Sequence, residues 1–266
     1  MTRKRFFMEQ ELGEQEETVR ITGSAFHHMK NVLRVRPGEE VDLRDGKGGR
    51  WLGVVREMDE KTIGLDLESI PPPLVESPLR LTLALAYGRA DRMELVVRQA
   101  TELGAHRMVF FRARRSQYGL SGEAERKKKE RWTRIAREAL RQCGRTMVPE
   151  VAFAKDVEEL LKAVLCWENE RGNVIRIVAV EGERSGDLLQ VWRKAPDGGG
   201  MVVAVGPEGG WTEDEVQGFR RAGFFSVGLG PRVLRLETAA AALTASVQLL
   251  WGDLSLGEGE RKATES

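Results

Sequence analysis

The order of hydrophobic and polar residues divides the chain into two parts. After Pro78, the stretches LRLTLALAY, RMVFF, IRIVAV, MVVAV and FFSVGLG are dominated by apolar residues. In DRMELVVRQATELG, VEELLKAVL and ETAAAALTASVQLLW, the apolar residues recur at helical spacing. Strands that are apolar throughout are buried on both faces, which is typical of parallel sheets covered by helices. The pattern predicts an α/β domain over residues 77–252 with a mostly parallel sheet.

Two of the predicted helices carry additional signals. In the helix that follows the first of these strands, Asp91 and Glu94 have the spacing of a capping box, and Gly104 is expected to end the helix. The long basic helix further on has its apolar residues on one face, namely Trp132, Ile135, Ala139 and Leu140. Both helices can therefore cover a sheet.

Residues 18–70 follow a different pattern. The short β-rich stretches TVRIT, EEVDLRD, RWLGVVREMD and TIGLDLESI are separated by the turn sequences RPGE, DGKGG and DEK. This predicts a small β-barrel over residues 1–73. The turn at residues 45–49 is predicted to close a hairpin rather than to cradle a phosphate, because no helix follows it and the Walker pattern is missing. Ile70-Pro-Pro-Pro-Leu74 favours an extended backbone and marks the domain boundary.

Composition restricts the class of protein. The 266 residues are 41% apolar and 31% charged, as in globular proteins, and no apolar run is long enough to span a bilayer. The N-terminal residues lack the apolar region of a secretion signal, and two cysteines are too few for a disulfide framework, so we expect a cytoplasmic protein. The three histidines have no companions at ligand spacing, so we expect no metal site. Residues 253–266 are predicted to be disordered.

The distribution of charge points to a polyanion. The net charge is only +1, but residues 112–145 are strongly basic. The first forty residues add Arg3, Lys4, Arg5, Lys30, Arg34 and Arg36. A basic stripe on a nearly neutral protein is typical of nucleic-acid binding. For the run Lys127–Lys129 alone, a solvated helix face with pairs such as Glu130 and Arg134 is an equally good explanation.

Two loops in the last quarter of the chain carry the clearest sign of a ligand site. One strand ends in Gly206-Pro-Glu-Gly-Gly210, and a second ends in Leu229-Gly-Pro231. Ligands of parallel sheets bind at the carboxyl ends of the strands, and glycine lets them approach the backbone closely. Thr212 and Glu215 form a capping box that occupies the first amides of the next helix, which argues against a phosphate there. Two tight turns without a ligand remain an alternative.

These loops belong to a larger set of motifs. The set consists of His27–Arg34, Arg98–Gly104, Gln142–Arg145, Gly206–Gly210 and Leu229–Ala239. This set resembles the motifs of the ribosomal RNA small subunit methyltransferase E family, within the SPOUT class. The resemblance covers almost the whole chain. The sequence departs from the family at Leu236, where the family usually has threonine, so one hydrogen bond near the cofactor could differ.

The resemblance implies a knotted fold and a cofactor. In SPOUT domains the C-terminal segment passes through a loop, and this deep trefoil knot forms the pocket for S-adenosyl-L-methionine. A PUA-like N-terminal barrel binds RNA, and the substrate is 16S ribosomal RNA, free or in the assembled small subunit. The family members are homodimers. The alanine-rich helix from Glu237 suits a dimer interface, although a helix buried within one subunit would have the same composition.

The resemblance also implies site residues. The expected cofactor-binding residues are Val180, Glu181, Gly206, Pro207, Glu208, Gly209, Gly210, Leu229, Gly230, Val233, Leu234, Leu236, Thr238 and Ala239. The residues expected to contact RNA are Arg3, Arg5, His28, Lys30, Arg34, Arg89 and Arg115.

The family reaction is methylation of N3 of a uridine. N3 is protonated at neutral pH, so the site needs a proton acceptor and donors that stabilise negative charge on the uracil oxygens. Arg232 and Arg235 are the candidate donors. Glu237 is the candidate acceptor, although it equally suits a cap of the helix that follows. Two alternatives stay open: a non-enzymatic RNA-binding or ribosome-assembly protein, and a SPOUT methyltransferase that acts on a different base or RNA.

Overall fold

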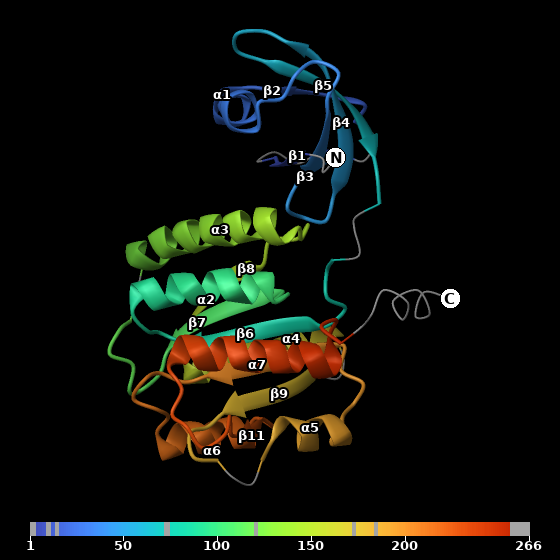
Figure 1. Cartoon of the computed structure of the whole chain (residues 1–266). Coiled ribbons are helices and arrows are strands. Elements are labelled where there is room, and N and C mark those ends of the chain that lie inside the picture. The colour runs from blue at the N-terminus through green and yellow to red at the C-terminus, as the bar shows by residue number, and fades with distance from the viewer. Residues whose placement is uncertain are drawn as a thin grey trace. The chain divides into compact units, whose positions relative to one another are not determined.

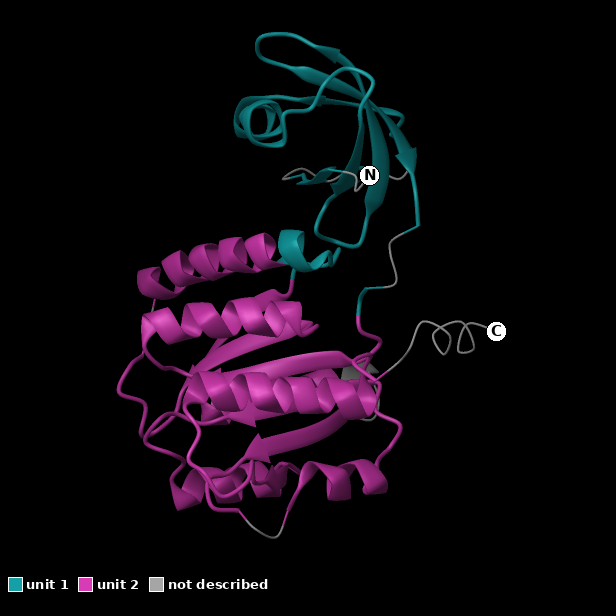
Figure 2. Cartoon of the chain, viewed as in Figure 1, with its two compact units in different colours: residues 1–76, 140–148 teal, residues 77–139, 149–266 magenta. Residues whose placement is uncertain are grey.

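The computed structural model describes residues 4–8, 12–13, 16–71, 75–119, 122–171, 174–183 and 186–255 (Figure 1). Arg3, residues 72–74 of the predicted boundary and residues 256–266 of the predicted tail lie outside this part of the chain. The chain forms two compact units (Figure 2). Unit 1 comprises residues 1–76 and 140–148, and unit 2 comprises residues 77–139 and 149–266.

A five-stranded sheet forms the core of unit 1. Its strand order is β1 (Lys4–Phe7), β3 (Glu40–Arg44), β4 (Arg50–Met58), β5 (Ile63–Ser69) and β2 (Thr18–Ile21). β1 pairs with β3 in parallel, and the other pairs are antiparallel. In the turn between β3 and β4, Asp45 Oδ1 accepts hydrogen bonds from the amides of Lys47 (2.7 Å) and Gly49 (2.9 Å). These bonds confirm the predicted hairpin at residues 45–49. Strand β1 was not predicted from the sequence.

A short helical segment packs against this sheet. Helix α1 (Gly23–His27) continues into the π-helix η1 (His28–Leu33). Phe26 and Met29 are buried in the core, and Lys30 remains exposed. Arg34 follows, with φ at 52°. In the described part of the chain, no other residue except glycine has a positive φ. Such backbone is uncommon for residues with a Cβ, so the conformation must be held by its surroundings. The Lys4 Nζ donates to the Arg34 carbonyl at 3.0 Å.

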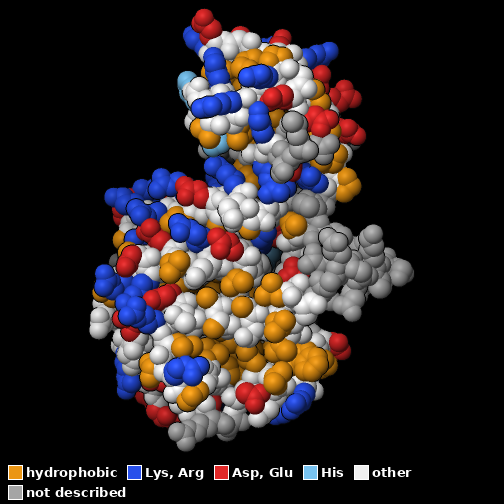
Figure 3. Space-filling view, in the orientation of Figure 1, with side chains coloured by type: hydrophobic (Ala, Val, Ile, Leu, Met, Phe, Trp, Pro, Cys, Tyr) orange, Lys and Arg blue, Asp and Glu red, His pale blue; other side chains and the backbone are white. Residues whose placement is uncertain are grey.

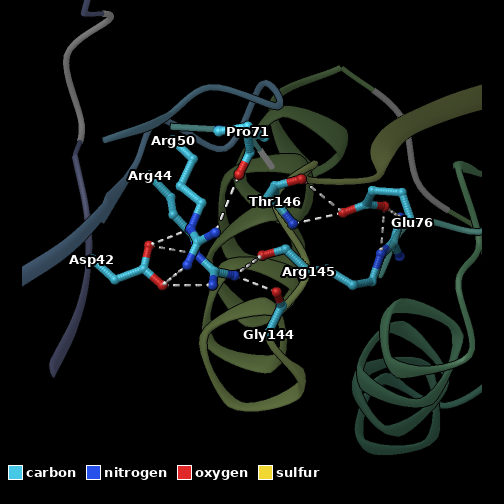
Figure 4. Close-up of polar contacts among 8 residues, drawn as sticks. All are labelled: Asp42, Arg44, Arg50, Pro71, Glu76, Gly144, Arg145 and Thr146. Carbon is cyan, nitrogen blue, oxygen red and sulfur yellow. Dashed lines mark hydrogen bonds and ion pairs between the residues drawn. The ribbon is translucent and has the colours of Figure 1, made fainter. Parts of the chain in front are cut away.

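Buried charges attach the end of a long helix, α3 (Glu123–Cys143), to the sheet of unit 1 (Figure 4). The Arg44 side chain, only 2% exposed, donates to both carboxylate oxygens of Asp42 and to the carbonyls of Gly144 and Arg145. Glu76 accepts from the Arg145 guanidinium at 2.9 Å and from the following amides of Thr146 and Met147. These bonds explain why residues 140–148 belong to unit 1.

Unit 2 contains a six-stranded sheet, and each of its pairings among the described residues is parallel. The strand order is β11 (Phe225–Val227), β9 (Val174–Ala179), β10 (Gly200–Val205), β6 (Arg80–Ala86), β7 (Arg107–Arg112) and β8 (Glu150–Asp156). Its helices, besides α3, are α2 (Ala90–Glu102), α4 (Val157–Arg171), α5 (Leu188–Lys194), α6 (Glu213–Arg221) and α7 (Leu236–Trp251). This confirms the predicted α/β class with a parallel sheet. The knot stays a prediction.

Helices cover both faces of the sheet in unit 2 (Figure 1). Helix α7 packs on β6 and β10 and lies beside α2, whereas α4 packs on β7 and β8 and contacts α6. Ala84 and Val202 lie in one core cluster with Leu160 of α4 and Phe219 of α6. The intervening strand residue Leu83 is also fully buried. Because alternate residues are buried on opposite faces, the strands are apolar throughout.

Some local predictions are confirmed and others are wrong. The capping box of Thr212 and Glu215 is present at the start of α6. The proposed box of Asp91 and Glu94 is absent: α2 starts after Arg89, and no side chain caps it. Glu94 instead pairs with Arg131 of α3 at 2.6 Å. Glu130 likewise pairs with Arg126 (2.5 Å), one turn before it, and not with the expected Arg134. Glu94 therefore pairs with another helix, and Glu130 pairs with the preceding turn of its own helix.

Candidate active site

A cavity of about 560 Å³ lies at the carboxyl ends of β9, β10 and β11, entirely within unit 2. Its wall consists of residues 179–183, 186–187, 205–208, 210–211 and 228–234, together with Leu236 and Ala239 at the start of α7. Ligand pockets have this size, and parallel sheets place them at this edge. The two glycine-proline loops singled out in the sequence thus meet at one cavity.

Most of the expected cofactor residues lie on the wall of this cavity. They are Val180, Glu181, Gly206, Pro207, Glu208, Gly210, Leu229, Gly230, Val233, Leu234, Leu236 and Ala239. Gly209 and Thr238 are not among the residues of the wall. Of the expected catalytic residues, Arg232 lies on the wall, and Arg235 and Glu237 lie beside it in the chain. The wall also includes residues that the sequence reasoning missed, among them Glu183, Gly186, Asp187 and Trp211.

The loop after β10 is folded tightly around Trp211. The Trp211 Nε1 donates to the Ala179 carbonyl at 2.8 Å, which ties this loop to the end of β9. A Cβ on Gly206 would come within 2.8 Å of the Trp211 ring, so glycine is needed there for close packing. Gly210 has φ at +69° and donates to the Pro207 carbonyl at 2.9 Å. Gly209 faces Arg115, whose Nη1 donates to the Gly209 carbonyl at 3.2 Å.

The loop after β11 is held by the segment that follows β9. The Val180 amide donates to Val227, and the Gly228 amide donates to Gly186 at 3.1 Å. A Cβ on Gly228 would come within 2.1 Å of the Glu183 carbonyl, a distance that no side chain could occupy. Beyond this point the chain opens toward solvent, and Val233 is 74% exposed. The two segments therefore form one packed rim.

Carboxylates dominate the charge of the cavity wall. Three of the four have partners: Glu183 pairs with Arg220 at 3.1 Å, Asp187 caps α5, and Glu208 pairs with Arg92. Glu181 is exposed and has no hydrogen-bond or ion-pair partner among the described residues. A carboxylate in that position can accept from a hydroxyl or an ammonium group of a ligand. The wall is thus suited to a ligand that carries positive charge and hydroxyl groups.

Arg92, at the start of α2, connects two of the expected site residues. Its guanidinium pairs with Glu208 of the β10 loop, and its Nε lies 3.8 Å from Glu237 Oε1. The other oxygen of Glu237, Oε2, is buried and has no partner within the described part of the chain. The sequence reasoning missed Arg92, although β6 is the neighbour of β10 in the sheet and α2 starts at its carboxyl end. Ligands of parallel sheets bind at the carboxyl ends of the strands, and applying this rule to β6 as well would have included Arg92.

The residues expected to contact RNA occur in both units. Arg5, His28, Lys30 and Arg34 lie in unit 1, and burial together with the positive charge of Arg141 lowers the pKa of His28. In unit 2, Arg89 lies 3.4 Å from Asp91, and Arg115 contacts the glycine loop. Of these two arginines, Arg115 is therefore close to a loop of the cavity.

Comparisons with known proteins identify the family. A model described as an RNA methyltransferase domain matches residues 75–248, and one described as an RNA methyltransferase PUA domain matches residues 21–68. Ribosomal RNA small subunit methyltransferase E of Bacillus subtilis is 30% identical over 259 residues, which are 94% of this chain and 99% of that protein. The chain belongs to the ribosomal RNA small subunit methyltransferase E family. This confirms the resemblance found in the motifs and the PUA-like nature of the N-terminal domain.

Solved structures of similar proteins share the fold. Ribosomal RNA small subunit methyltransferase E from Neisseria gonorrhoeae, crystallised with S-adenosyl methionine, is 31% identical, with a TM-score of 0.80 over 95% of this chain and 100% of that one. The protein Lpg2936 from Legionella pneumophila, in complex with the same cofactor, is 27% identical, also with a TM-score of 0.80, over 96% of this chain and 100% of that one. The methyltransferase E fold thus extends over nearly the whole chain.

Neither a cluster of metal-ligating side chains nor a membrane-spanning helix occurs in the part of the chain that the structure describes. Within the described residues of this methyltransferase E chain, no group of three or more His, Cys, Asp or Glu side chains is placed to hold a metal ion. No helix in the same part of the chain has both the length and the apolar character needed to cross a membrane.

Proposed function

We propose that this protein transfers a methyl group from S-adenosyl-L-methionine to N3 of a uridine in 16S ribosomal RNA, and that it does so in the cytoplasm. One observation carries the proposal: a cavity lined by two glycine loops and four carboxylates lies at the strand ends of a chain that is 31% identical to a family member crystallised with this cofactor. The uridine target rests on the family resemblance.

The residues of the cavity suit the cofactor. S-adenosyl-L-methionine contains a sulfonium cation, an ammonium group and two ribose hydroxyls, and the wall offers the carboxylates of Glu181 and Glu208 to them. Leu229, Leu234 and Leu236 supply apolar surface for the adenine ring. When bound, the cofactor supplies an electrophilic methyl group. The task of the protein is to exclude water, orient the uracil and remove the N3 proton.

Two arginines are proposed to stabilise the charge that develops on the uracil. Arg232 lies on the cavity wall, and Arg235 immediately precedes α7 with its side chain exposed. Neither has an ion-pair partner among the described residues, so both guanidiniums can bind a carbonyl oxygen. Negative charge moves to the uracil oxygens as N3 loses its proton, and a fixed positive charge lowers the energy of that state.

Glu237 is proposed to take part in the removal of that proton. Its Oε2 has no hydrogen-bond donor in the described part of the chain and therefore remains an acceptor, while Oε1 faces Arg92. The same contact with Arg92 is compatible with a purely positioning role, in which Glu237 fixes the first turn of α7. Replacing Glu237 with glutamine removes the proton acceptor but keeps the shape. A catalytic base would therefore be revealed by the loss of the acid limb of the pH–rate profile.

We further propose that the protein works as a homodimer through the face that carries α7. Thr238, Ala242 and Ala245 lie along one side of this helix at helical spacing, and Leu249, 52% exposed, continues the line. Leu95 on the neighbouring helix α2 is 39% exposed. Figure 3 shows apolar side chains gathered over this face of unit 2. A dimer should appear in sedimentation equilibrium, and Ala245→Arg should convert it to a monomer.

One experiment separates the proposed function from its alternatives. Tritium from labelled S-adenosyl-L-methionine should appear in 16S ribosomal RNA, tested both as free RNA and as the assembled small subunit. Digestion to nucleosides and mass spectrometry should then identify 3-methyluridine. Binding of RNA without transfer of label would indicate a non-enzymatic RNA-binding protein. Label in another nucleoside would indicate a methyltransferase of the same class with a different target.

A further inference from the structure

The last turn of α3 presents an exposed arginine, Arg141, to the RNA-binding residues expected in unit 1. Arg141 lies three residues before Gly144, which directly follows the helix with φ at +87°. A Cβ on Gly144 would be 3.2 Å from the Arg5 Nη1, so the Arg5 guanidinium lies against the same turn. The His28 ring lies 5.7 Å from that of Phe6, which follows Arg5 in β1. Its lowered pKa, caused by burial and by the charge of Arg141, agrees with this placement.

Two of the acidic groups near this turn are already bound. Asp42 is held by Arg44 at 2.8 Å and by Arg50 at 3.0 Å (Figure 4). Glu76 is held by the Arg145 guanidinium and by two backbone amides. Arg5 and Arg141 have no ion-pair partner among the described residues. Their charges are therefore available to a ligand.

Arg44 already satisfies the backbone that follows α3. Arg141 lies in the last turn of α3, where a positive charge is favoured by the partial negative charge of the helix end. Just beyond the helix, the carbonyls of Gly144 and Arg145 accept from the buried Arg44. Arg5 and Arg141 are thus not needed as donors to these two carbonyls.

Other exposed arginines of unit 1 differ in this respect. Arg20 and Arg56 are 78% and 71% exposed, yet they pair with Glu57 and Asp66 respectively. Carboxylates thus neutralise some arginines of this unit, whereas Arg34, like Arg5 and Arg141, is exposed and has no ion-pair partner among the described residues. A group of arginines without counter-charges is the footprint of a polyanion, and guanidinium groups bind phosphate well.

We propose that the last turn of α3 is part of the RNA-binding surface of unit 1, with Arg141 and Arg5 contacting phosphates of the RNA. The inference rests on the proposed function, because it takes RNA as the substrate. The inference goes beyond the proposed function because it adds Arg141 to the RNA site. In the sequence, Arg141 lies between β7 and β8, two strands of unit 2. The buried network of Figure 4 then has a second role, since it ties the residues that follow Arg141 to the sheet that contains Arg5.

The test compares two variants that each remove one positive charge from unit 1. Arg141→Ala and Arg56→Ala are titrated with a fluorescein-labelled fragment of 16S ribosomal RNA in a series of potassium chloride concentrations. Arg141→Ala should weaken binding and reduce the slope of log K against log salt by about 0.7 to 0.9, the loss of one phosphate contact. Arg56→Ala should keep the wild-type slope, because its charge is compensated by Asp66. Arg141→Lys should restore most of the slope.

The outcomes distinguish this inference from the proposed function. If the wild-type protein binds the RNA fragment and Arg141→Ala has the same slope, the inference is wrong and the proposed function stands. If weakened binding comes with an unchanged slope, Arg141 acts only through the structure of the turn, and the inference is also wrong. If the wild-type protein binds cofactor but no RNA, the proposed substrate itself is wrong. Equal competition by polyglutamate would overturn RNA as the specific partner.

Discussion

Replacement of Arg44 by leucine should destabilise unit 1 and leave the cofactor cavity intact. The Arg44 side chain is 2% exposed, and leucine retains its apolar contacts while removing every donor. Two buried carbonyls, those of Gly144 and Arg145, would lose a charged donor. Asp42 would keep Arg50 as a partner, at 3.0 Å. All these groups belong to unit 1, whereas the cavity wall belongs to unit 2.

The size of the effect follows from these contacts. A buried acceptor that loses its donor costs about 1 to 3 kcal/mol, and removing one partner of a buried ion pair costs about 3 to 5 kcal/mol. Because Arg50 still neutralises Asp42, we expect a total loss of about 3 to 5 kcal/mol in the free energy of unfolding of unit 1. For a unit of this size that corresponds to a fall in melting temperature of at least about 10 °C.

Hydrogen exchange measured by mass spectrometry gives the local answer. Peptides that cover β3 and residues 140–148 should exchange much faster in the variant, whereas peptides from β6 and β10 should be unchanged. Calorimetric titration should show an unaltered affinity for S-adenosyl-L-methionine. Arg56→Leu is the matched control, because its exposed pair with Asp66 should contribute less than about 1 kcal/mol. A loss below 1 kcal/mol in Arg44→Leu would refute the reasoning.

Acid should act on the same network. Burial alone would raise the pKa of Asp42, but hydrogen bonds from Arg44 and Arg50 outweigh it, and the pKa is lowered. A carboxyl whose pKa is lower in the folded state stabilises the fold above its unfolded pKa of about 4, and this contribution is lost as the pH falls through the folded value. Wild-type stability should therefore fall below about pH 4 more steeply than that of Arg44→Leu.

Three further predictions concern unit 2. Arg235→Ala should bind cofactor and RNA almost normally but methylate about 100- to 1000-fold more slowly in single turnover. The control Arg221→Ala, which removes another exposed arginine, should stay active. Full activity of Arg235→Ala, or its dissociation into monomers, would remove Arg235 from the proposed catalytic residues. Arg92→Ala should weaken cofactor binding roughly tenfold by calorimetry, because the β10 loop loses its ion pair, and Arg92→Lys should recover part of it. Gly228→Ala should abolish cofactor binding in a protein that still melts cooperatively, since the new Cβ would meet the Glu183 carbonyl; retained affinity would contradict the packed rim.

The parts of the fold that depend on local pattern could be predicted from the sequence. Apolar residues at successive positions around Leu83 and Val203 required burial on both faces, and the structure buries both. Thr212 capped its helix as predicted because its partner Glu215 lies on the first turn of the same helix. The glycine loops met at one cavity because parallel strands end at the same edge of a sheet.

The parts that depend on distant partners could not be predicted. Arg92 lies in an ordinary helix start, and its role depends on Glu208, which is 116 residues further along the chain. Glu94 had the correct spacing for a cap but pairs with Arg131 on another helix. The attachment of Arg145 to unit 1 through Glu76 likewise leaves no mark in the local sequence. Gly209 was expected to bind the cofactor, which stays a prediction, and the contact of its carbonyl with Arg115 could not be read from the local sequence either.

The division of the chain has a consequence for anyone who wishes to transplant its parts. Unit 1 is not a continuous block, because the chain leaves it after Glu76, returns at Leu140 and leaves again after Val148. A chimaera that exchanges only residues 1–76 with a relative would receive a new sheet but keep the old helix end. A swap would then succeed only where the donor sequence has an arginine in place of Arg44 and a carboxylate in place of Glu76. Natural recombination at a single crossover would face the same restriction, so the two segments of unit 1 are expected to be inherited together.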